Sequence, residues 1–262
     1  MKSAVQKLAD VFRSFSDASG GRRFTSAVIL AAGCGSRFGT EKGKKQFVPV
    51  CSVPALVHTL RAFVQSELIS EIVLVTAEED IARCREYCDE YGIQKIRAIV
   101  SGGSDRQASA RRGFDAISPQ AEFVAIHDGA RCLVTTEIID RTVRAAYDSG
   151  AAVAAQKARD TVKRAASDGT VAETPERSAM WLAATPQVFL ANMYRAAVYT
   201  AEKEHVSATD DSALAERLGF RVKLVDCGNE NLKLTTPVDV CIAEAILKRR
   251  QEESRDADRA RI

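Results

Sequence analysis

The amino-acid sequence predicts an α/β fold, a mostly parallel, Rossmann-like open sheet with a protruding β-hairpin arm. Three observations indicate this fold. Short, almost wholly apolar runs recur along the chain, which is typical of strands buried on both faces. Helical segments separate these runs, and such alternation favours parallel strands joined by right-handed crossovers. The alternation then breaks at a segment whose Ser-Asp-Gly turn indicates a hairpin.

The first part of the chain supplies the regular alternation. Apolar runs predict strands at residues 27–32, 71–76, 96–100, 123–127 and 151–155, and the helices between them are predicted at residues 54–66, 78–92, 104–117 and 135–150. Open α/β sheets bind their ligands at the carboxyl ends of their strands. We therefore expect the polar segments that follow these strands to converge in one cleft.

The remainder of the chain is predicted to hold the arm and a short closing run of elements. Residues 160–189 contain two short β-prone pieces, and because an isolated hairpin is marginally stable, we expect the arm to pack on a surface such as a second subunit. Helices are predicted at about 191–203 and 210–218, followed by a strand at 221–226 and a last helix from about Pro237 to Arg250. The charged tail beyond this helix is expected to fray.

These elements predict one domain at residues 25–250, with the arm at about 157–178. An N-terminal extension, residues 1–24, precedes the domain, and a charged C-terminal tail, residues 251–262, follows it. The extension is amphipathic without the unbroken apolar stretch of a secretory signal, and no apolar run approaches the ~18 residues that span a membrane. We therefore expect a cytoplasmic protein that does not associate with membranes.

Charge and cysteine content narrow the function classes. The formal net charge is +2, from 37 basic and 35 acidic residues, which argues against a nucleic-acid binder and still permits a local site for a small anion. The seven cysteines are odd in number and scattered, which favours reduced thiols in a cytosolic protein.

The first apolar run leads into a glycine loop, Gly-Cys-Gly-Ser-Arg-Phe-Gly, at residues 33–39. Its spacing differs from the dinucleotide pattern G-x-G-x-x-G, no acidic residue follows about 20 positions on, and it is not a GK[ST] phosphate loop. The remaining interpretation is an anion-binding loop in which consecutive backbone N–H groups face a phosphate. Arg37 and Lys45 are placed to contact the same phosphates. Lys42 and Lys44 are interpreted as plain surface charges, and a simple glycine turn is the alternative interpretation of the loop.

Two further polar segments fall at the same predicted edge of the sheet. Gly103 and Ser109 lie in a segment that suits a nucleobase or ribose, although a glycine turn with Ser104 as a helix N-cap explains it as well. Asp128 stands one residue past a buried strand, where its carboxylate could hold Mg²⁺ or cap the next turn. His127 ends an apolar strand and is interpreted as structural.

Two basic residues complete the candidate set. Arg131 could pair with Asp128 or hold a substrate phosphate. Lys233 alternates with Leu232 and Leu234, for which a solvated lysine is the default interpretation. The helix start that follows it would, however, bring Lys233 back to the edge of the cleft.

Taken in order, these segments resemble the 2-C-methyl-D-erythritol 4-phosphate cytidylyltransferase family. The resemblance spans residues 26 to about 248 and is carried by AAGCGSRF, KKQF, GGSDRQAS, HDGAR, DTVKR, ATPQVF, TDDSAL and NLKLTTPVD. Many nucleotidyltransferases share the opening signature, whereas the later segments together are specific. The resemblance implies an open sheet of the nucleotidyltransferase type. It also implies that CTP and a polyol phosphate, 2-C-methyl-D-erythritol 4-phosphate, react to give the cytidine diphosphate alcohol and pyrophosphate in non-mevalonate isoprenoid precursor synthesis.

The resemblance also implies roles for residues at the matching positions. The catalytic cations would be Arg37, Lys45 and Lys233; the ligand of Mg²⁺ or another divalent cation would be Asp128; CTP would be bound by Ala31, Ala32, Gly33, Gly35, Gly103, Ser109 and Gly129; and the polyol phosphate would be bound by Arg131, Thr161, Arg177, Thr185 and Thr209. Because the family takes some of the last contacts from a partner's exchanged hairpin, the resemblance implies a homodimer formed through the arm.

The sequence departs from the family at several positions. The family usually has proline where Lys44 and Cys132 stand, an acid where Ser104 stands, and Val-Asp where Pro175 and Glu176 stand. A ribitol 5-phosphate cytidylyltransferase, which shares the opening loop, is the nearest alternative activity. A non-catalytic nucleotide-binding module is the alternative from another class, although we would expect it to lack the arginine, lysines and aspartate that are present.

Overall fold

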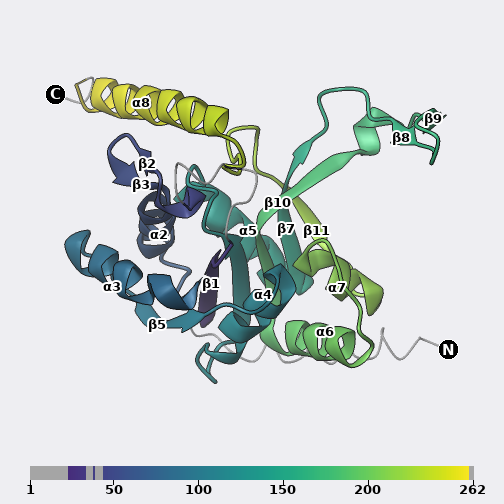
Figure 1. Cartoon of the computed structure of the whole chain (residues 1–262), viewed down its shortest axis with the longest axis horizontal. Coiled ribbons are helices and arrows are strands. Elements are labelled where there is room, and N and C mark those ends of the chain that lie inside the picture. The colour runs from purple at the N-terminus through teal and green to yellow at the C-terminus, as the bar shows by residue number, and fades with distance from the viewer. Residues whose placement is uncertain (1–22, 34–37, 39–43, 260–262) are drawn as a thin grey trace.

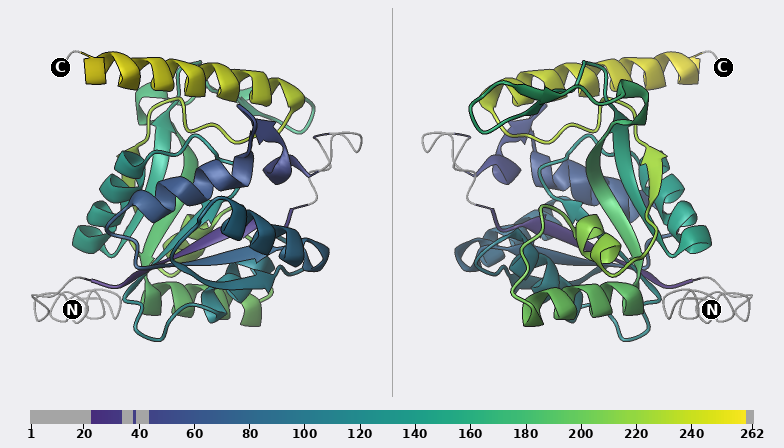
Figure 2. Two further views of the ribbon diagram at one scale, coloured as in Figure 1. Left: turned by 90° about the vertical axis from the view of Figure 1, so that its left-hand side faces the viewer. Right: turned by 90° about the vertical axis from the view of Figure 1, so that its right-hand side faces the viewer.

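A seven-stranded sheet with helices on both faces forms the body of the molecule (Figures 1 and 2). The structure is a computed structural model that describes residues 23–33, 38 and 44–259, and the statements below refer to these residues. The strands in spatial order are β11 (Lys223–Asp226), β7 (Ala151–Lys157), β10 (Trp181–Leu190), β6 (Phe123–Asp128), β1 (Thr25–Ala31), β4 (Glu71–Thr76) and β5 (Ile96–Ser101).

The sheet is mostly parallel, as predicted. β1 pairs in parallel with β4 and β6, β4 with β5, and β7 with β11. β10 alone runs antiparallel to its two neighbours, β6 and β7. The sequence analysis predicted this segment only as the second β-prone piece of the hairpin at residues 160–189, and not as a strand of the main sheet. Its second half, residues 184–189, is buried and inserts into the sheet.

The helices cover the two faces because successive strand residues point in opposite directions. Ile29 belongs to the core beneath α2 (Ala55–Gln65), α3 (Ile81–Glu90) and α5 (Thr136–Ser149), whereas its neighbour Val28 belongs to the core beneath the opposite group. That second group is α4 (Arg106–Asp115), α6 (Ala191–Lys203) and α7 (Asp211–Arg217). Both faces of the central strands are therefore buried, which is why they appear as unbroken apolar runs.

The last helix, α8 (Pro237–Arg259), packs beside a small ribbon formed by β2 (Pro49–Val50) and β3 (Val53–Pro54), and Figure 1 shows it extending beyond the ribbon. Val50, Leu234 and Ala243 share the small core between them. The prediction that the last helix ends at about Arg250 was wrong, because helical structure continues for two more turns. No glycine or proline interrupts this charged stretch, and pairs one turn apart, such as Arg249 with Glu253 at 3.6 Å, accompany it.

The predicted hairpin arm is confirmed. β7 and β10 leave the body of the sheet still paired, with Trp181 opposite Lys157. The tip consists of β8 (Arg164–Ala165) and β9 (Val171–Glu173), which Figure 1 shows beyond the edge of the sheet. The tip strands are exposed throughout, so the arm has no core of its own in the single chain.

Two expectations about the chain as a whole can be compared with the described residues. None of the described helices combines the length and the apolar character needed to cross a membrane. The six cysteines in the described part of the chain are all free, and Cys84, Cys88, Cys132 and Cys227 are buried.

Candidate active site

A cleft opens beside the carboxyl ends of β1, β5 and β6, at the edge where the sequence predicted ligand binding. Its volume is about 380 Å³. It is lined by Leu30, Ala31, Ala32, Gly33, Lys45, Gln46, Gly103, Ser104, Asp105, Arg106, Ser109, Asp128, Ala130 and Lys233. The fold thus brings Lys45, Asp128 and Lys233 together, as the sequence predicted.

The first wall of the cleft is the start of the glycine loop after β1. A Cβ atom added to Gly33 would meet no heavy atom within 4 Å, so this residue borders open space. The buried Gln46 side chain supports the loop, because its Nε2 donates to the carbonyl oxygens of Ala31 at 2.6 Å and Gly33 at 3.2 Å. Two predicted phosphate contacts, Gly35 and Arg37, lie outside the described residues.

The second wall is the turn between β5 and α4. The Gly103 amide donates to Ser109 Oγ at 3.0 Å, and this hydroxyl donates to the Asp105 carbonyl at 2.7 Å. A Cβ atom at Gly103 would lie 2.5 Å from Ala108 Cβ, so the turn requires glycine. The helix N-cap is Asp105, whose carboxylate accepts the Ala108 amide at 2.8 Å, and not Ser104 as predicted.

Asp128 is the centre of charge in the cleft. Its Oδ2 lies 2.7 Å from Lys233 Nζ and 3.9 Å from Arg131 Nε, and its Oδ1 lies 3.2 Å from Arg106 Nε. Burial by itself disfavours the carboxylate, but Arg106, Lys233 and Arg131 outweigh this effect and hold the pKa of Asp128 well below its usual range. Asp128 is therefore ionised at neutral pH.

Arg106 is a cleft residue that the sequence analysis missed. It is shared between two carboxylates, because its NH1 also donates to Asp211 Oδ2 at 2.7 Å. Asp211 is buried and accepts a second hydrogen bond from the buried Tyr194 hydroxyl at 2.6 Å. Although burial opposes the charge of Arg106, Asp211 and Asp128 raise its pKa further above the ordinary range. The sequence feature that could have indicated Arg106 is its position in GGSDRQAS, because this places it in the first turn of a helix that begins beside the cleft.

Behind Asp128 lies a small buried network. The Thr185 hydroxyl accepts the Asp128 amide at 3.1 Å and hydrogen bonds with His127 Nδ1 at 3.0 Å. Burial lowers the pKa of His127 to about 3, so its imidazole is neutral, and its structural interpretation is confirmed. Thr185, predicted to contact the polyol phosphate, is likewise buried with its hydroxyl engaged. Arg131 is held in the same region by donating from NH1 to the Asn231 carbonyl at 2.8 Å.

Several predicted contacts do not line the cleft of their own chain. Thr161 and Arg177 are exposed on the arm, and Thr209 is exposed just before α7. Gly129 lies beside the cleft, and its amide donates to the Leu30 carbonyl at 2.8 Å. The arm therefore supplies nothing to the cleft within one subunit.

The donor set of the cleft determines what kind of metal could bind there. In the described parts of the chain, no group of three or more histidine, cysteine or acidic side chains could hold a metal ion. Asp128 is a single carboxylate surrounded by cations. Because Mg²⁺ at phosphate sites usually takes only one or two protein carboxylates, with phosphate oxygens and waters as its other ligands, this arrangement fits a cation that arrives with a nucleotide.

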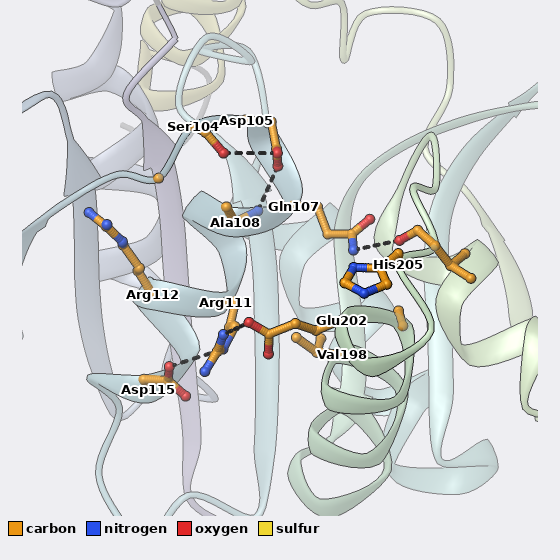
Figure 3. A pocket seen from close by; sticks show the side chains of 13 residues that line it. Ser104, Asp105, Gln107, Ala108, Arg111, Arg112, Asp115, Val198, Glu202 and His205 are labelled. Carbon is orange, nitrogen blue, oxygen red and sulfur yellow. Dashed lines mark hydrogen bonds and ion pairs between the residues drawn. The ribbon is translucent and has the colours of Figure 1, made fainter.

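A larger pocket of about 590 Å³ adjoins the cleft between α4 and α6 and shares Gly103, Ser104 and Asp105 with it (Figure 3). Its charged groups largely neutralise one another. Arg111 pairs with both Glu202 and Asp115, as Figure 3 shows. The smaller cleft, with its surplus of cations, is therefore the better site for a polyphosphate.

Comparison with known proteins agrees with the geometry. The family model described as 2-C-methyl-D-erythritol 4-phosphate cytidylyltransferase matches residues 25–249. Proteins of that name from Desulforamulus reducens and Syntrophus aciditrophicus are 44% and 42% identical, each over 86% of this chain and 96% of the relative. The crystal structure of 4-diphosphocytidyl-2C-methyl-D-erythritol synthase from Anaerococcus prevotii superposes with a TM-score of 0.78 at 32% identity, covering 87% of this chain and all of that one.

Proposed function

The chain belongs to the 2-C-methyl-D-erythritol 4-phosphate cytidylyltransferase family, and from this we infer that it transfers the cytidylyl group of CTP to 2-C-methyl-D-erythritol 4-phosphate. The products are pyrophosphate and 4-(cytidine 5'-diphospho)-2-C-methyl-D-erythritol, a step of non-mevalonate isoprenoid precursor synthesis. The observation that carries this function is the convergence of Lys45, Lys233 and Arg106 on one cleft beside a glycine loop. Such a cleft suits a reaction between two polyanions.

The chemistry requires positioning and neutralisation of charge. A phosphate oxygen of the polyol phosphate attacks the α-phosphorus of CTP in line, and the bond to pyrophosphate breaks. A phosphate monoester is already ionised at neutral pH, so the reaction needs neither a general base nor a covalent enzyme intermediate. Lys45 and Lys233 stabilise the charge that builds on the α-phosphoryl and leaving-group oxygens. Arg37, which lies outside the described residues, is assigned the same task on its sequence match alone.

Asp128 is the residue that would hold Mg²⁺ or another divalent cation. When bound, such a cation neutralises phosphate oxygens and orients them. Arg106 and Lys233 keep Asp128 ionised, so the carboxylate is ready to serve as a ligand. The base and ribose of CTP are assigned to the wall formed by Gly103 and Ser109.

Replacement of the two lysines tests this function. Lys45→Ala and Lys233→Ala should each lower kcat by about 10²–10³-fold, by analogy with the loss of one oxyanion donor. The measurement is pyrophosphate release from CTP with 2-C-methyl-D-erythritol 4-phosphate, and Lys248→Ala, an exposed lysine on α8, is the control. Unchanged turnover in the lysine variants would refute their roles. Faster reaction with ribitol 5-phosphate, assayed in parallel, would favour the alternative substrate.

We further propose that the protein works as a homodimer that exchanges its arms. Thr161 and Arg177 cannot contact the polyol phosphate unless an arm reaches a cleft, and within one chain it does not. The arm also exposes Val171 and Leu182, which are 61% and 50% accessible in the single chain. Exposed apolar side chains on a projecting hairpin favour burial against a second subunit.

We also propose a domain organisation and a location for the protein. Residues 25–250 form the catalytic domain in this proposal, with residues 1–24 as an extension and residues 251–262 as the C-terminal segment. We place the enzyme in the cytoplasm because the described cysteines are free thiols, which is typical of reducing compartments. Cell fractionation followed by detection of the protein tests this location.

A further inference from the structure

The segment that carries Lys45 into the cleft is attached to the rest of the protein on both sides. Lys45 begins the short 3-10 turn η2 (Lys45–Phe47). The preceding residue, Lys44, places its Nζ 2.5 Å from Asp80 Oδ2 and 2.6 Å from Glu79 Oε1. The following residue, Gln46, binds the carbonyls at the start of the glycine loop.

We propose that Lys44 and Gln46 are positioning residues that hold Lys45 in the cleft from either side. Lys44 ties the turn to η3 (Glu78–Asp80), the 3-10 turn after β4. Gln46 ties it to the residues that follow β1. The proposal rests on the role assigned to Lys45 in the proposed function, and it explains why a lysine predicted to be a surface charge is ion-paired.

The ion pair of Lys44 with Asp80 is the stronger of its two attachments. The Asp80 side chain is only 10% exposed, whereas that of Glu79 is 70% exposed and its pair is screened by water. Burial opposes the charge on Lys44, but the hydrogen bonds that Lys44 donates to Asp80 and Glu79 outweigh this effect and raise the pKa of Lys44. Lys44 therefore remains a cation at neutral pH and keeps both attachments.

The backbone shows why fixing Lys44 fixes the turn. Lys44 has φ −73° and ψ 126°, and its carbonyl accepts the Phe47 amide at 2.9 Å, which closes η2. Phe47 is buried against the Tyr87 ring of α3, with ring centroids 5.9 Å apart. Lys44 and Phe47 thus hold the backbone on either side of Lys45, which fixes the direction in which the Lys45 side chain leaves the backbone.

Gln46 links the turn to the orientation of the glycine loop. One amide group donates to two carbonyl oxygens, so both carbonyls face Gln46. In a trans peptide the following N–H points the opposite way, so the Ala32 amide points away from Gln46. Gln46 therefore sets the direction of the Ala32 amide, just before the glycine loop, and also ties this segment to the turn that carries Lys45.

Substitutions at Lys44 and Asp80 test the first half of the proposal, the positioning role of Lys44. Lys44→Met and Asp80→Asn should each lower kcat about tenfold, because small misplacements of a catalytic group are costly, and the double variant should be no slower than either single variant. Lys44→Pro should restore turnover, because proline fixes φ near −65° and the native φ is close to this value. Additive effects, or a Lys44→Pro variant as slow as Lys44→Met, would overturn the proposal.

Matched controls separate positioning from folding. Arg217→Met removes an exposed ion pair to Glu204, 2.9 Å long, far from the turn in sequence, and should leave kcat unchanged. Thermal unfolding midpoints of all variants show whether lost stability accounts for lost turnover. A fall in kcat that disappears once the folded fraction is taken into account would contradict positioning.

Gln46→Leu and Gln46→Glu test the second half of the proposal, the positioning role of Gln46. Leucine cannot donate, and a carboxylate would face two carbonyl oxygens, so both variants should raise KM for CTP about tenfold. An unchanged KM for CTP would remove Gln46 from the proposal.

Lys45→Ala distinguishes a failure of the positioning proposal from a failure of the role assigned to Lys45. If Lys45→Ala is inactive while the Lys44 and Gln46 variants are normal, only the positioning proposal fails. If Lys45→Ala turns over normally, the assigned role of Lys45 fails first.

Discussion

Asp128 and Asp211 both bind the Arg106 side chain and hold it in the cleft. Asp128 faces the substrate side and also carries Lys233, whereas Asp211 lies beneath and makes its second hydrogen bond to Tyr194. If a divalent cation competes with Arg106 for Asp128, or a phosphate competes with Asp128 for Arg106, Asp211 remains as a partner for Arg106. Two carboxylates with different exposure thus keep a guanidinium in place while its surroundings change.

Asp211→Asn is expected to weaken both stability and turnover. The amide oxygen can still accept the Tyr194 hydroxyl, but the charge opposite Arg106 is lost. Breaking a buried pair costs about 3–5 kcal/mol, and because the Arg106 side chain is 31% exposed and can take up water, we expect a loss of about 2 kcal/mol in the free energy of unfolding. Urea unfolding at neutral pH measures it, and kcat should fall as well.

Tyr194→Phe is the control for Asp211→Asn. It removes one hydrogen bond to the same carboxylate and leaves the Arg106 pair intact, so it should cost about 1 kcal/mol with kcat unchanged. If Tyr194→Phe lowered kcat as much as Asp211→Asn, the charge of Asp211 would not be the reason for either effect.

The cleft residues that could be predicted from the sequence stand either at the end of an apolar strand or in a segment that resembles the family. Asp128 was predicted because it ends a buried strand, and Lys233 because the chain turns back after it. The pairing of Arg106 with Asp211 spans 105 positions, and no local pattern indicates which carboxylate a distant arginine will meet. Lys44 was wrongly assigned to the surface for the same reason, since its partners lie 35 and 36 positions away.

At the scale of elements, the strands with two buried faces were the most predictable. Their apolar runs are too short for a typical helix and are bounded by polar segments, which favours strands. The strand β10 was harder to predict. One part of it belongs to the exposed arm and the other to the sheet, so its composition changes along its length. The extent of α8 was missed because its last turns are polar on all sides, a pattern that suits a fraying tail as well as a solvated helix.

The last turns of α8 are expected to be dispensable. In residues 251–259, the side chains that the structure describes are exposed, and their ion pairs, such as Arg259 with Asp256, lie in solvent. A chain ending after Arg250 should therefore lose less than about 1 kcal/mol of unfolding free energy and keep its kcat. Arg250→Ala should cost more, about 1–2 kcal/mol, because Arg250 donates to the Leu133 carbonyl at 2.9 Å and pairs with Glu230. Chemical unfolding of the three proteins compares them, and equal losses would contradict this division of the helix.

At the scale of the whole molecule, the arm of one chain does not reach the cleft of the same chain. The described cations that line the cleft, Lys45, Arg106 and Lys233, belong to the body of the chain, whereas Thr161 and Arg177, two of the residues predicted to meet the polyol phosphate, stand on the arm. A symmetric dimer resolves this, because a two-fold axis that brings one arm to the partner's cleft brings the other arm back. Such an arrangement would make the binding of the second substrate depend on assembly.

Mixing two defective subunits tests whether the arms are exchanged. Asp128→Asn disables the cleft and leaves the arm intact, while Arg177→Ala weakens the arm and leaves the cleft intact. In a mixed dimer with exchanged arms, the intact cleft receives the intact arm, so one of its two sites is fully restored. Random association of equal amounts makes about half of the dimers mixed, and activity should therefore reach about one quarter of the wild-type value at low polyol phosphate concentration. Steady-state rates of the coexpressed pair measure this recovery. If each arm instead served its own chain, the mixture would do no better than the average of the two variants assayed separately, since no subunit would then hold both intact parts.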